Sequence, residues 1–195
     1  VTAGHLRLWI AGEATNLLRL VVPLWDPGAQ EEPHDCRLSA ARHRQDLVCL
    51  VTTSQESRWL VVRARETTGD GEVTLQVGPW QPPPWELSAA PPLERVDDHL
   101  LCTVQESAQL FYLGRMVSGG QRVLLLVHCL FVGGASGWYH LGRLVIPPPA
   151  GLPQPEAPVR LLTALPEKEG LRLELQWAAG AQEAVYRVLR YPRGW

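Results

Sequence analysis

The sequence is poor in several residue types, and each shortage narrows what the chain can be. Lysine occurs once, at Lys168, and asparagine once, at Asn16, where the Leu-Leu that follows leaves no glycosylation sequon. Four cysteines in 195 residues are too few for a small protein built on a disulfide framework. These shortages indicate an intracellular or otherwise unglycosylated setting.

An excess of one charge and a long apolar run are also missing. Lys plus Arg number 18 and Asp plus Glu number 20, so the formal net charge is −2. The longest apolar stretch, Val123 to Val132, has the length of a strand and contains His128. We therefore expect no membrane span and no nucleic-acid partner, since nothing draws the whole chain to polyanions.

What the sequence does have is apolar content and regular spacing. Hydrophobic residues make up 46% of the chain, which is enough for a substantial core. Apolar segments of strand length recur along the sequence at 5–11, 17–24, 46–52, 58–64, 72–77, 99–105, 110–116, 122–131, 138–146, 159–164, 171–177 and 185–190. This spacing predicts an all-β, mostly antiparallel protein of the β-sandwich type with about 12 short strands.

Helical periodicity is almost absent. The segment Leu38 to Asp46, with its Ala-Ala-Arg-His-Arg centre, is the best place for one short helix, and we expect at most one.

Two proline-rich stretches, 79–92 and 146–158, divide the strands into groups. Proline lacks the N–H that a β-ladder needs, so both stretches are predicted to be connectors. We expect a β lobe over 1–80 and another over 93–195, with a single elaborate domain as the alternative. Because the chain begins at Val1 and its only methionine is Met116, it is expected to be a processed chain or an excised domain.

An internal similarity links two segments about 53 residues apart. Asp46-Leu-Val-Cys-Leu-Val and the residues after it resemble His99-Leu-Leu-Cys-Thr-Val and the residues after that, and each segment reads as three strands. The similarity suggests duplicated half-domains, with propeller blades as the alternative.

The segment 155–190 carries a second pattern. It has a proline-rich start, the alternating strand Leu171 to Trp177, and then a strand that bears Tyr186. This order resembles the opening strands of a fibronectin type III domain and implies a β-sandwich there. No family is indicated for the chain as a whole.

Several groups of histidine and cysteine residues are candidates for metal binding or disulfide formation. His34, Cys36, His43 and Cys49 form one set of potential zinc ligands, and His99, Cys102, His128 and Cys129 form another. Neither set has the paired spacing of a zinc site, so we expect no metal and no cofactor. Disulfides Cys36–Cys49 and Cys102–Cys129 are left open.

Catalytic motifs are missing as well. The run Asp97-Asp98-His99 holds two carboxylates beside an imidazole, but neighbouring residues of a strand point to opposite faces and cannot all converge. We therefore predict no catalytic residues.

Arginine and tryptophan are the remaining candidates for binding. Eight tryptophans are either exposed contact residues or core fillers. Arginines at spacings that share a strand face occur at Arg42 and Arg44, at Arg63 and Arg65, and at Arg187, Arg190 and Arg193. We select five residues as candidate contacts for an acidic partner or for single-stranded nucleic acid, with solvated strand faces as the alternative: Trp59, Arg63, Arg65, Arg190 and Tyr191.

Together these observations favour a non-catalytic module for protein interaction or scaffolding, part of a larger chain or assembly. The alternatives are a β-rich domain that binds nucleic acid or carbohydrate, and a degenerate relative of an enzyme on a β fold. The oligomeric state is left open.

Overall fold

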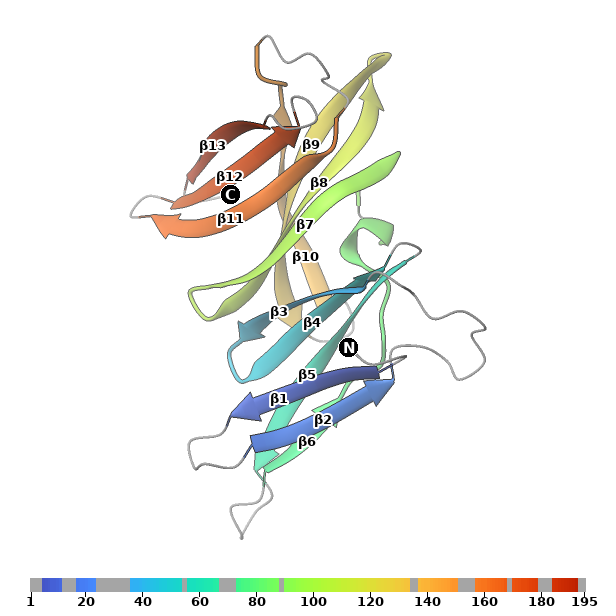
Figure 1. Ribbon diagram of the computed structural model, residues 1–195, viewed down its shortest axis with the longest axis vertical. Coiled ribbons are helices and arrows are strands. Elements are labelled where there is room, and N and C mark those ends of the chain that lie inside the picture. The colour runs from blue at the N-terminus through green and yellow to red at the C-terminus, as the bar shows by residue number, and fades with distance from the viewer. Residues whose placement is uncertain are drawn as a thin grey trace. The chain divides into compact units, whose positions relative to one another are not determined.

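The protein is all-β. The computed structural model describes residues 5–11, 17–23, 36–53, 56–66, 73–87, 90–133, 137–150, 157–167, 170–178 and 184–192. The strands paired there are antiparallel, and the residues so described divide into two compact units (Figure 1). The first unit is Val1–Ser39 with Gln45–Pro82, and the second is Ala40–Arg44 with Pro83–Trp195.

The first unit holds a hairpin and most of a four-stranded sheet. The hairpin is β1 (His5–Ala11) with β2 (Leu17–Pro23). The sheet has the order β3-β4-β5-β6. Its strands are β3 (Cys36–His43), β4 (Asp46–Thr53), β5 (Ser57–Glu66) and β6 (Val73–Val77). The buried side chains Val48 to Val51 make the middle of β4 the best protected part of this sheet.

The helix expected at Leu38 to Asp46 is wrong. This segment forms β3 and a turn at Arg44 and Gln45, and Arg44 has a left-handed φ of 55°. Tertiary bonds decide the conformation, because Thr103 Oγ1 accepts from Arg42 N at 2.8 Å and Glu106 O accepts from Arg44 N at 2.8 Å. These bonds outweigh the weak helical preference of the two alanines.

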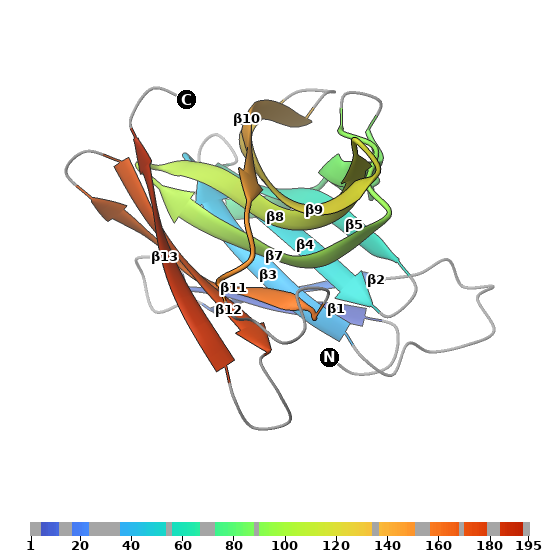
Figure 2. The same ribbon diagram turned by 90° about the horizontal axis from the view of Figure 1, so that it is seen from above.

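The second unit is a β-sandwich. A four-stranded sheet of order β10-β9-β8-β7 curves beside a three-stranded sheet of order β11-β12-β13 (Figure 2). The larger sheet is formed by β7 (Arg95–Val104), β8 (Ser107–Ser118), β9 (Gln121–Gly133) and β10 (Gly137–Ile146). The smaller is formed by β11 (Val159–Glu167), β12 (Gly170–Ala178) and β13 (Ala184–Pro192).

The core of the sandwich lies between these two sheets. The larger sheet contributes Phe111, Leu113, Leu124, Leu126 and Ile146, and the smaller contributes Val159, Leu161, Leu173, Leu175 and Trp177. The alternation of apolar and polar residues along β12 produces this arrangement, since Leu173, Leu175 and Trp177 are buried and the residues between them are only partly so.

The other face of the larger sheet is covered by the segment that leads into β7. A single turn of 3-10 helix, η1 (Pro84–Glu86), places Trp85 over this face, and Leu93 packs on Gly114 of β8. A Cβ at Gly114 would lie 2.4 Å from Leu93 Cδ1, so the glycine lets Leu93 lie directly on the sheet.

Candidate functional site

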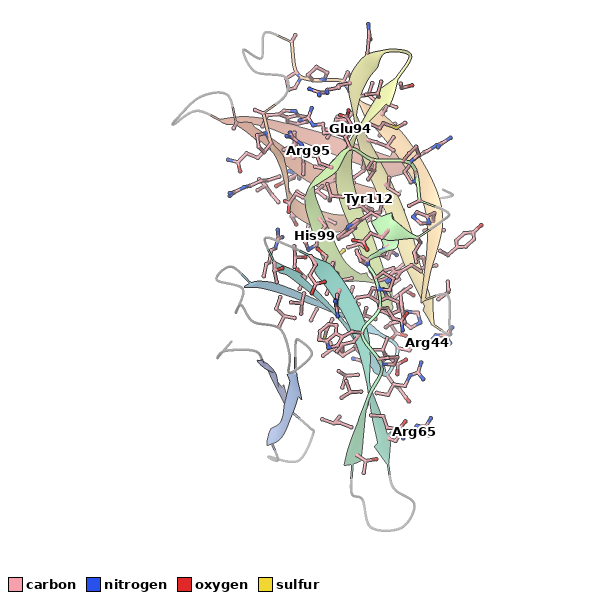
Figure 3. All side chains as sticks on the ribbon, turned by 90° about the vertical axis from the view of Figure 1, so that its right-hand side faces the viewer. Arg44, Arg65, Glu94, Arg95, His99 and Tyr112 are labelled. Atoms are coloured by element: carbon pink, nitrogen blue, oxygen red, sulfur yellow. The ribbon has the colours of Figure 1, made fainter. Side chains whose placement is uncertain are left out.

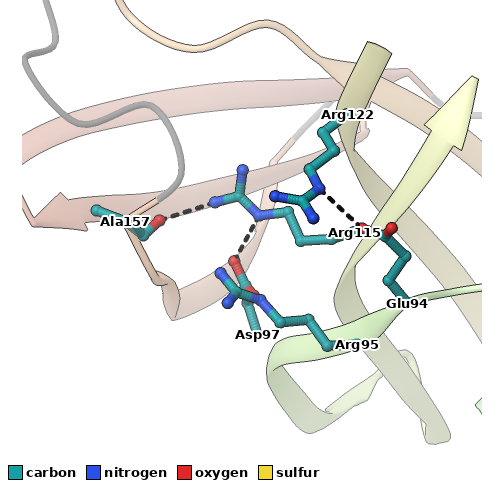
Figure 4. A network of polar contacts seen from close by, with 6 residues as sticks. All are labelled: Glu94, Arg95, Asp97, Arg115, Arg122 and Ala157. Atoms are coloured by element: carbon teal, nitrogen blue, oxygen red, sulfur yellow. Dashed lines mark hydrogen bonds and ion pairs between the residues drawn. The ribbon is translucent and has the colours of Figure 1, made fainter. Parts of the chain in front are cut away.

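A buried ion pair within the larger sheet also contacts the segment that leads into β11 (Figure 4). Arg115 is 4% exposed, and its Nε lies 2.9 Å from Asp97 Oδ2. Its other nitrogen, Nη2, donates to Ala157 O at 2.7 Å, just before β11. The exposed Arg95 adds a contact of 2.7 Å to Asp97 Oδ1. Both charges are therefore compensated inside the protein, which fits a structural role.

The carboxylates of the run Asp97-Asp98-His99 are used in the same way. The ladder between β7 and β8 has a register shift between Val96 and Asp98. Asp97 pairs with Arg115, and Asp98 Oδ2 accepts the backbone N–H of Leu161 at 2.8 Å. His99 stands apart from them, because its ring lies against Trp85 at 5.5 Å. The run therefore holds the sandwich together and forms no convergent site.

An aromatic and imidazole cluster occupies the opposite face of the larger sheet. Trp85 contacts both His99 and Tyr112 with ring centroids 5.5 Å apart, and Tyr112 Oη lies 3.2 Å from His140 Nε2 (Figure 3). Burial raises the pKa of Tyr112 far above its ordinary range and lowers the pKa of His140. At neutral pH both groups are uncharged, and the cluster supplies packing and a hydrogen bond between Tyr112 and His140.

The imidazole of His128 is buried on the sandwich side. Its ring stacks on Phe111 with centroids 4.3 Å apart, and Nε2 lies 2.8 Å from Gln109 Oε1. Burial lowers the pKa of His128 to about 4, because the charged ring would lose its hydration. His128 is thus a neutral core residue.

The cysteines settle the disulfide question for the described residues. Cys49, Cys102 and Cys129 are thiols without a bridge. Cys102 pairs with Gln109 and Cys129 with Leu110, so the two cysteines stand on opposite faces of the sheet with β8 between them. Burial raises the pKa of Cys49 and of Cys129 to about 12, which leaves both thiols protonated and unreactive.

The same registers separate the members of the second set of potential zinc ligands from one another. Cys102 and His128 lie on the sandwich face of the larger sheet, whereas His99 and Cys129 lie on the other face. Within the ranges given above, no three His, Cys, Asp or Glu side chains come together as a metal site. His34 lies outside those ranges.

Trp59, the first candidate contact residue, is a core residue. Its side chain is 6% exposed, and its Nε1 donates to Pro82 O at 2.7 Å. Its backbone bonds Gln81 in both directions, at 3.0 and 2.8 Å. The indole therefore anchors the proline-rich stretch to β5 and offers no exposed contact surface.

The other tryptophans whose side chains are described behave similarly. Trp138 is 5% exposed and Trp177 is 1% exposed, while Trp80 and Trp85 are half-buried. Packing inside the protein thus explains the presence of these tryptophans. They do not support the interpretation of tryptophan as a binding residue.

Arg63 and Arg65 do lie on one exposed face of β5. Arg63 forms an ion pair of 3.2 Å with Asp46 of the neighbouring strand β4. On its other side it stands opposite Gln76 of β6. Arg65 stands opposite Thr74 beside the paired strands β5 and β6 (Figure 3). These two arginines, with Thr74 and Gln76, form a polar surface that we call the arginine ledge.

The remaining candidates lie elsewhere. Arg190 and Tyr191 are in β13, opposite Arg172 and Leu171 of β12, and neighbouring positions of a strand belong to opposite faces. Arg190 and Tyr191 therefore do not share one face of β13. They are part of the second unit, while the arginine ledge is part of the first.

An exposed apolar corner was missed by the sequence reasoning. Tyr139 of β10 is 61% exposed and stands opposite Leu130 of β9, and Val132, two residues further along, is 50% exposed. We call these three residues the β9–β10 corner. Leu130 and Tyr139 lie on the sandwich face of the sheet beyond the buried cluster, and Val132 lies at the register shift between Gly137 and Trp138. Since Tyr139 sits in an alternating strand like any other, no local signal distinguished it.

Comparison with protein-family models, with curated proteins and with solved structures finds no match to this chain. Among the residues that the structure describes, no helix is long and apolar enough to cross a bilayer.

Proposed function

We propose that the chain is a non-catalytic protein-interaction module. The observation that supports this proposal is the β9–β10 corner, where Leu130 and Val132 lie near Tyr139, which has the highest exposed fraction among the described large hydrophobic residues. Exposed aromatic side chains among aliphatic ones are typical of the centre of protein interfaces.

The alternatives are less well supported by the same residues. A carbohydrate site needs polar side chains that converge beside the aromatic ring, whereas the residue opposite Tyr139 across the ladder is the aliphatic Leu130. A nucleic-acid surface needs clustered cations, whereas the corner contains none. The described polar clusters of the second unit make their hydrogen bonds and ion pairs with other residues of the protein. This argues against a relative of an enzyme.

Site-specific photo-crosslinking tests this proposal. A photoreactive phenylalanine analogue is placed at Tyr139 and, as a matched control, at Gln121, an exposed polar position of the same sheet. Cross-linking in a native extract should give a discrete, stoichiometric protein product from position 139 only. Excess unlabelled protein should compete the product away, and a Tyr139→Arg competitor should not. Equal patterns from both positions, or products that contain only nucleic acid or glycan, would contradict the proposal.

A further inference from the structure

The outer edge of β6 is the starting point for a second surface, which is independent of the β9–β10 corner. β6 ends the sheet order β3-β4-β5-β6, so no described strand pairs with its outer side. Exposed strand edges offer unpaired N–H and C=O groups to any extended chain, and proteins usually protect them.

Other sheet edges show such protection. The ladders of β7, β10 and β11 with their neighbours each contain a register shift, which distorts the edge. The ladder of β5 with β6 runs from Val62↔Val77 to Glu66↔Val73 without one. β13 also pairs regularly with β12.

The outward groups of β6 can be assigned from the ladder. Gly78 N donates to Val61 O at 2.8 Å, so alternate pairs from there toward Glu66 are hydrogen-bonded to β5. The residues between those pairs, among them Leu75 and Val77, direct their N–H and C=O groups outward. Two regularly spaced donor and acceptor sets therefore line this edge.

The two faces beside the edge differ in chemistry. On one face lies the arginine ledge, with Arg63, Arg65, Thr74 and Gln76 exposed. On the other face Leu75 and Val77 stand opposite Ala64 and Val62, and Val77 is 38% exposed. A strand added here would therefore meet positive charge on one side and apolar surface on the other.

Among the side chains that the structure describes, the charge on the ledge is only partly compensated. Asp46 pairs with Arg63 at 3.2 Å, but among the described side chains no carboxylate pairs with Arg65. A guanidinium that is exposed and unpaired near a strand edge is suited to receive a carboxylate.

We propose that the edge of β6 binds an extended acidic segment of a partner protein as an added strand. The segment alternates acidic and apolar residues, with its carboxylates over Arg63 and Arg65 and its apolar side chains beside Leu75 and Val77. Main-chain bonds to Leu75 and Val77 hold the strand, and the alternation fixes which face it presents.

The test uses the full 195-residue protein and short synthetic peptides as probes. The first is an alternating Glu-Val peptide, and the second is its Lys-Val counterpart. On titration the Glu-Val peptide should slow amide hydrogen exchange at Leu75 and Val77, and higher salt should weaken its binding. The Lys-Val peptide should not bind.

Two further arms separate added-strand binding from unspecific attraction. The Arg65→Glu variant should bind the Glu-Val peptide about tenfold more weakly, while Arg58→Glu, on the same strand but the opposite face, should bind it normally. A peptide N-methylated at its Val positions and one N-methylated at its Glu positions should differ in affinity for the protein. The reason is that only one of the two sets of amides faces β6 in a given strand direction.

Equal binding of both N-methylated peptides, or unchanged exchange at Leu75 and Val77, would overturn the proposal. Because the wild-type protein is used in the peptide arms, a folding defect of a variant cannot produce that result. Cross-linking at Tyr139 is read separately, so failure at β6 leaves the proposed interaction function to its own test.

Discussion

At the scale of single residues, the buried polar side chains are committed to structure. Arg115, Asp97 and Asp98 connect the two sheets of the sandwich, and His128 fills a place between Phe111 and Gln109. Each is stabilising only while its partners remain, because an uncompensated buried polar group costs free energy.

The pKa of His128 leads to a prediction about pH. Its pKa is about 4 in the folded protein against about 6.5 in an unfolded chain, so the unfolded state binds a proton first as the pH falls. The contribution of the neutral His128 ring to the free energy of unfolding is therefore fully present above pH ~6.5. It is lost between about pH 6.5 and 4, by an amount on the order of 3 kcal/mol. Chemical denaturation at several pH values measures it.

The His128→Leu variant is the comparison for this experiment. Its free energy of unfolding should depend less steeply on pH in that window, by up to about one proton per molecule. An identical slope in the two proteins would show that His128 does not titrate as its burial requires.

At the scale of the elements, periodicity predicted most of the fold. All twelve segments expected from apolar spacing form strands, often longer by a few residues. An alternating segment such as Leu171 to Trp177 places all its apolar side chains on one face only when it is a strand. β3 was missed, since the bonds of Arg42 and Arg44 that fix it come from residues some sixty positions away.

The two similar segments of the sequence form similar elements. β4, β5 and β6 are consecutive antiparallel neighbours, and so are β7, β8 and β9. The resemblance of 155–190 to a fibronectin type III domain stays a prediction; β11, β12 and β13 also pair in chain order.

The candidate site was less predictable than the fold. Alternation indicates that Arg63 and Arg65 share a face, and they do. It does not reveal whether a tryptophan such as Trp59 lies under other residues, nor that Tyr139 lies beyond the covered part of its sheet. Those properties depend on where neighbouring elements end.

The turn between β7 and β8 gives a prediction at this scale. Gln105 and Glu106 both have positive φ, 49° and 63°, which corresponds to a type I′ turn. Asn and Gly suit these positions better, so Gln105→Asn with Glu106→Gly should stabilise the protein by about 1 kcal/mol. Thermal and denaturant unfolding measure the gain. The bond from Arg44 N uses only the backbone oxygen of Glu106 and should survive; a loss of stability would contradict the turn assignment.

At the scale of the whole molecule, each unit has its own buried thiol. Cys49 belongs to the first unit and Cys129 to the second, and both are fully buried. Labelling of these cysteines therefore reports separately on the opening of each unit.

The Arg115→Met variant provides the corresponding prediction. It leaves the buried carboxylate of Asp97 with only Arg95, so the second unit should lose about 3 kcal/mol or more, and Cys129 should be labelled at least tenfold faster. Cys49 should change much less. Arg122→Met, which removes the exposed pair with Glu94 at 3.2 Å, is the control. Equal acceleration at both thiols would indicate that the chain opens as one cooperative body.

The division of β3 between the units bears on how the protein can be cut. Because the first unit ends at Pro82, a truncated protein that contains the second unit would be designed to begin at Pro83. A fragment that begins there would lack Arg42 and Arg44, whose backbone bonds hold Thr103 and the 105–106 turn. Truncation at this point would expose the end of the β7–β8 hairpin, whereas grafting residues 40–44 back through a short linker would restore its bonds.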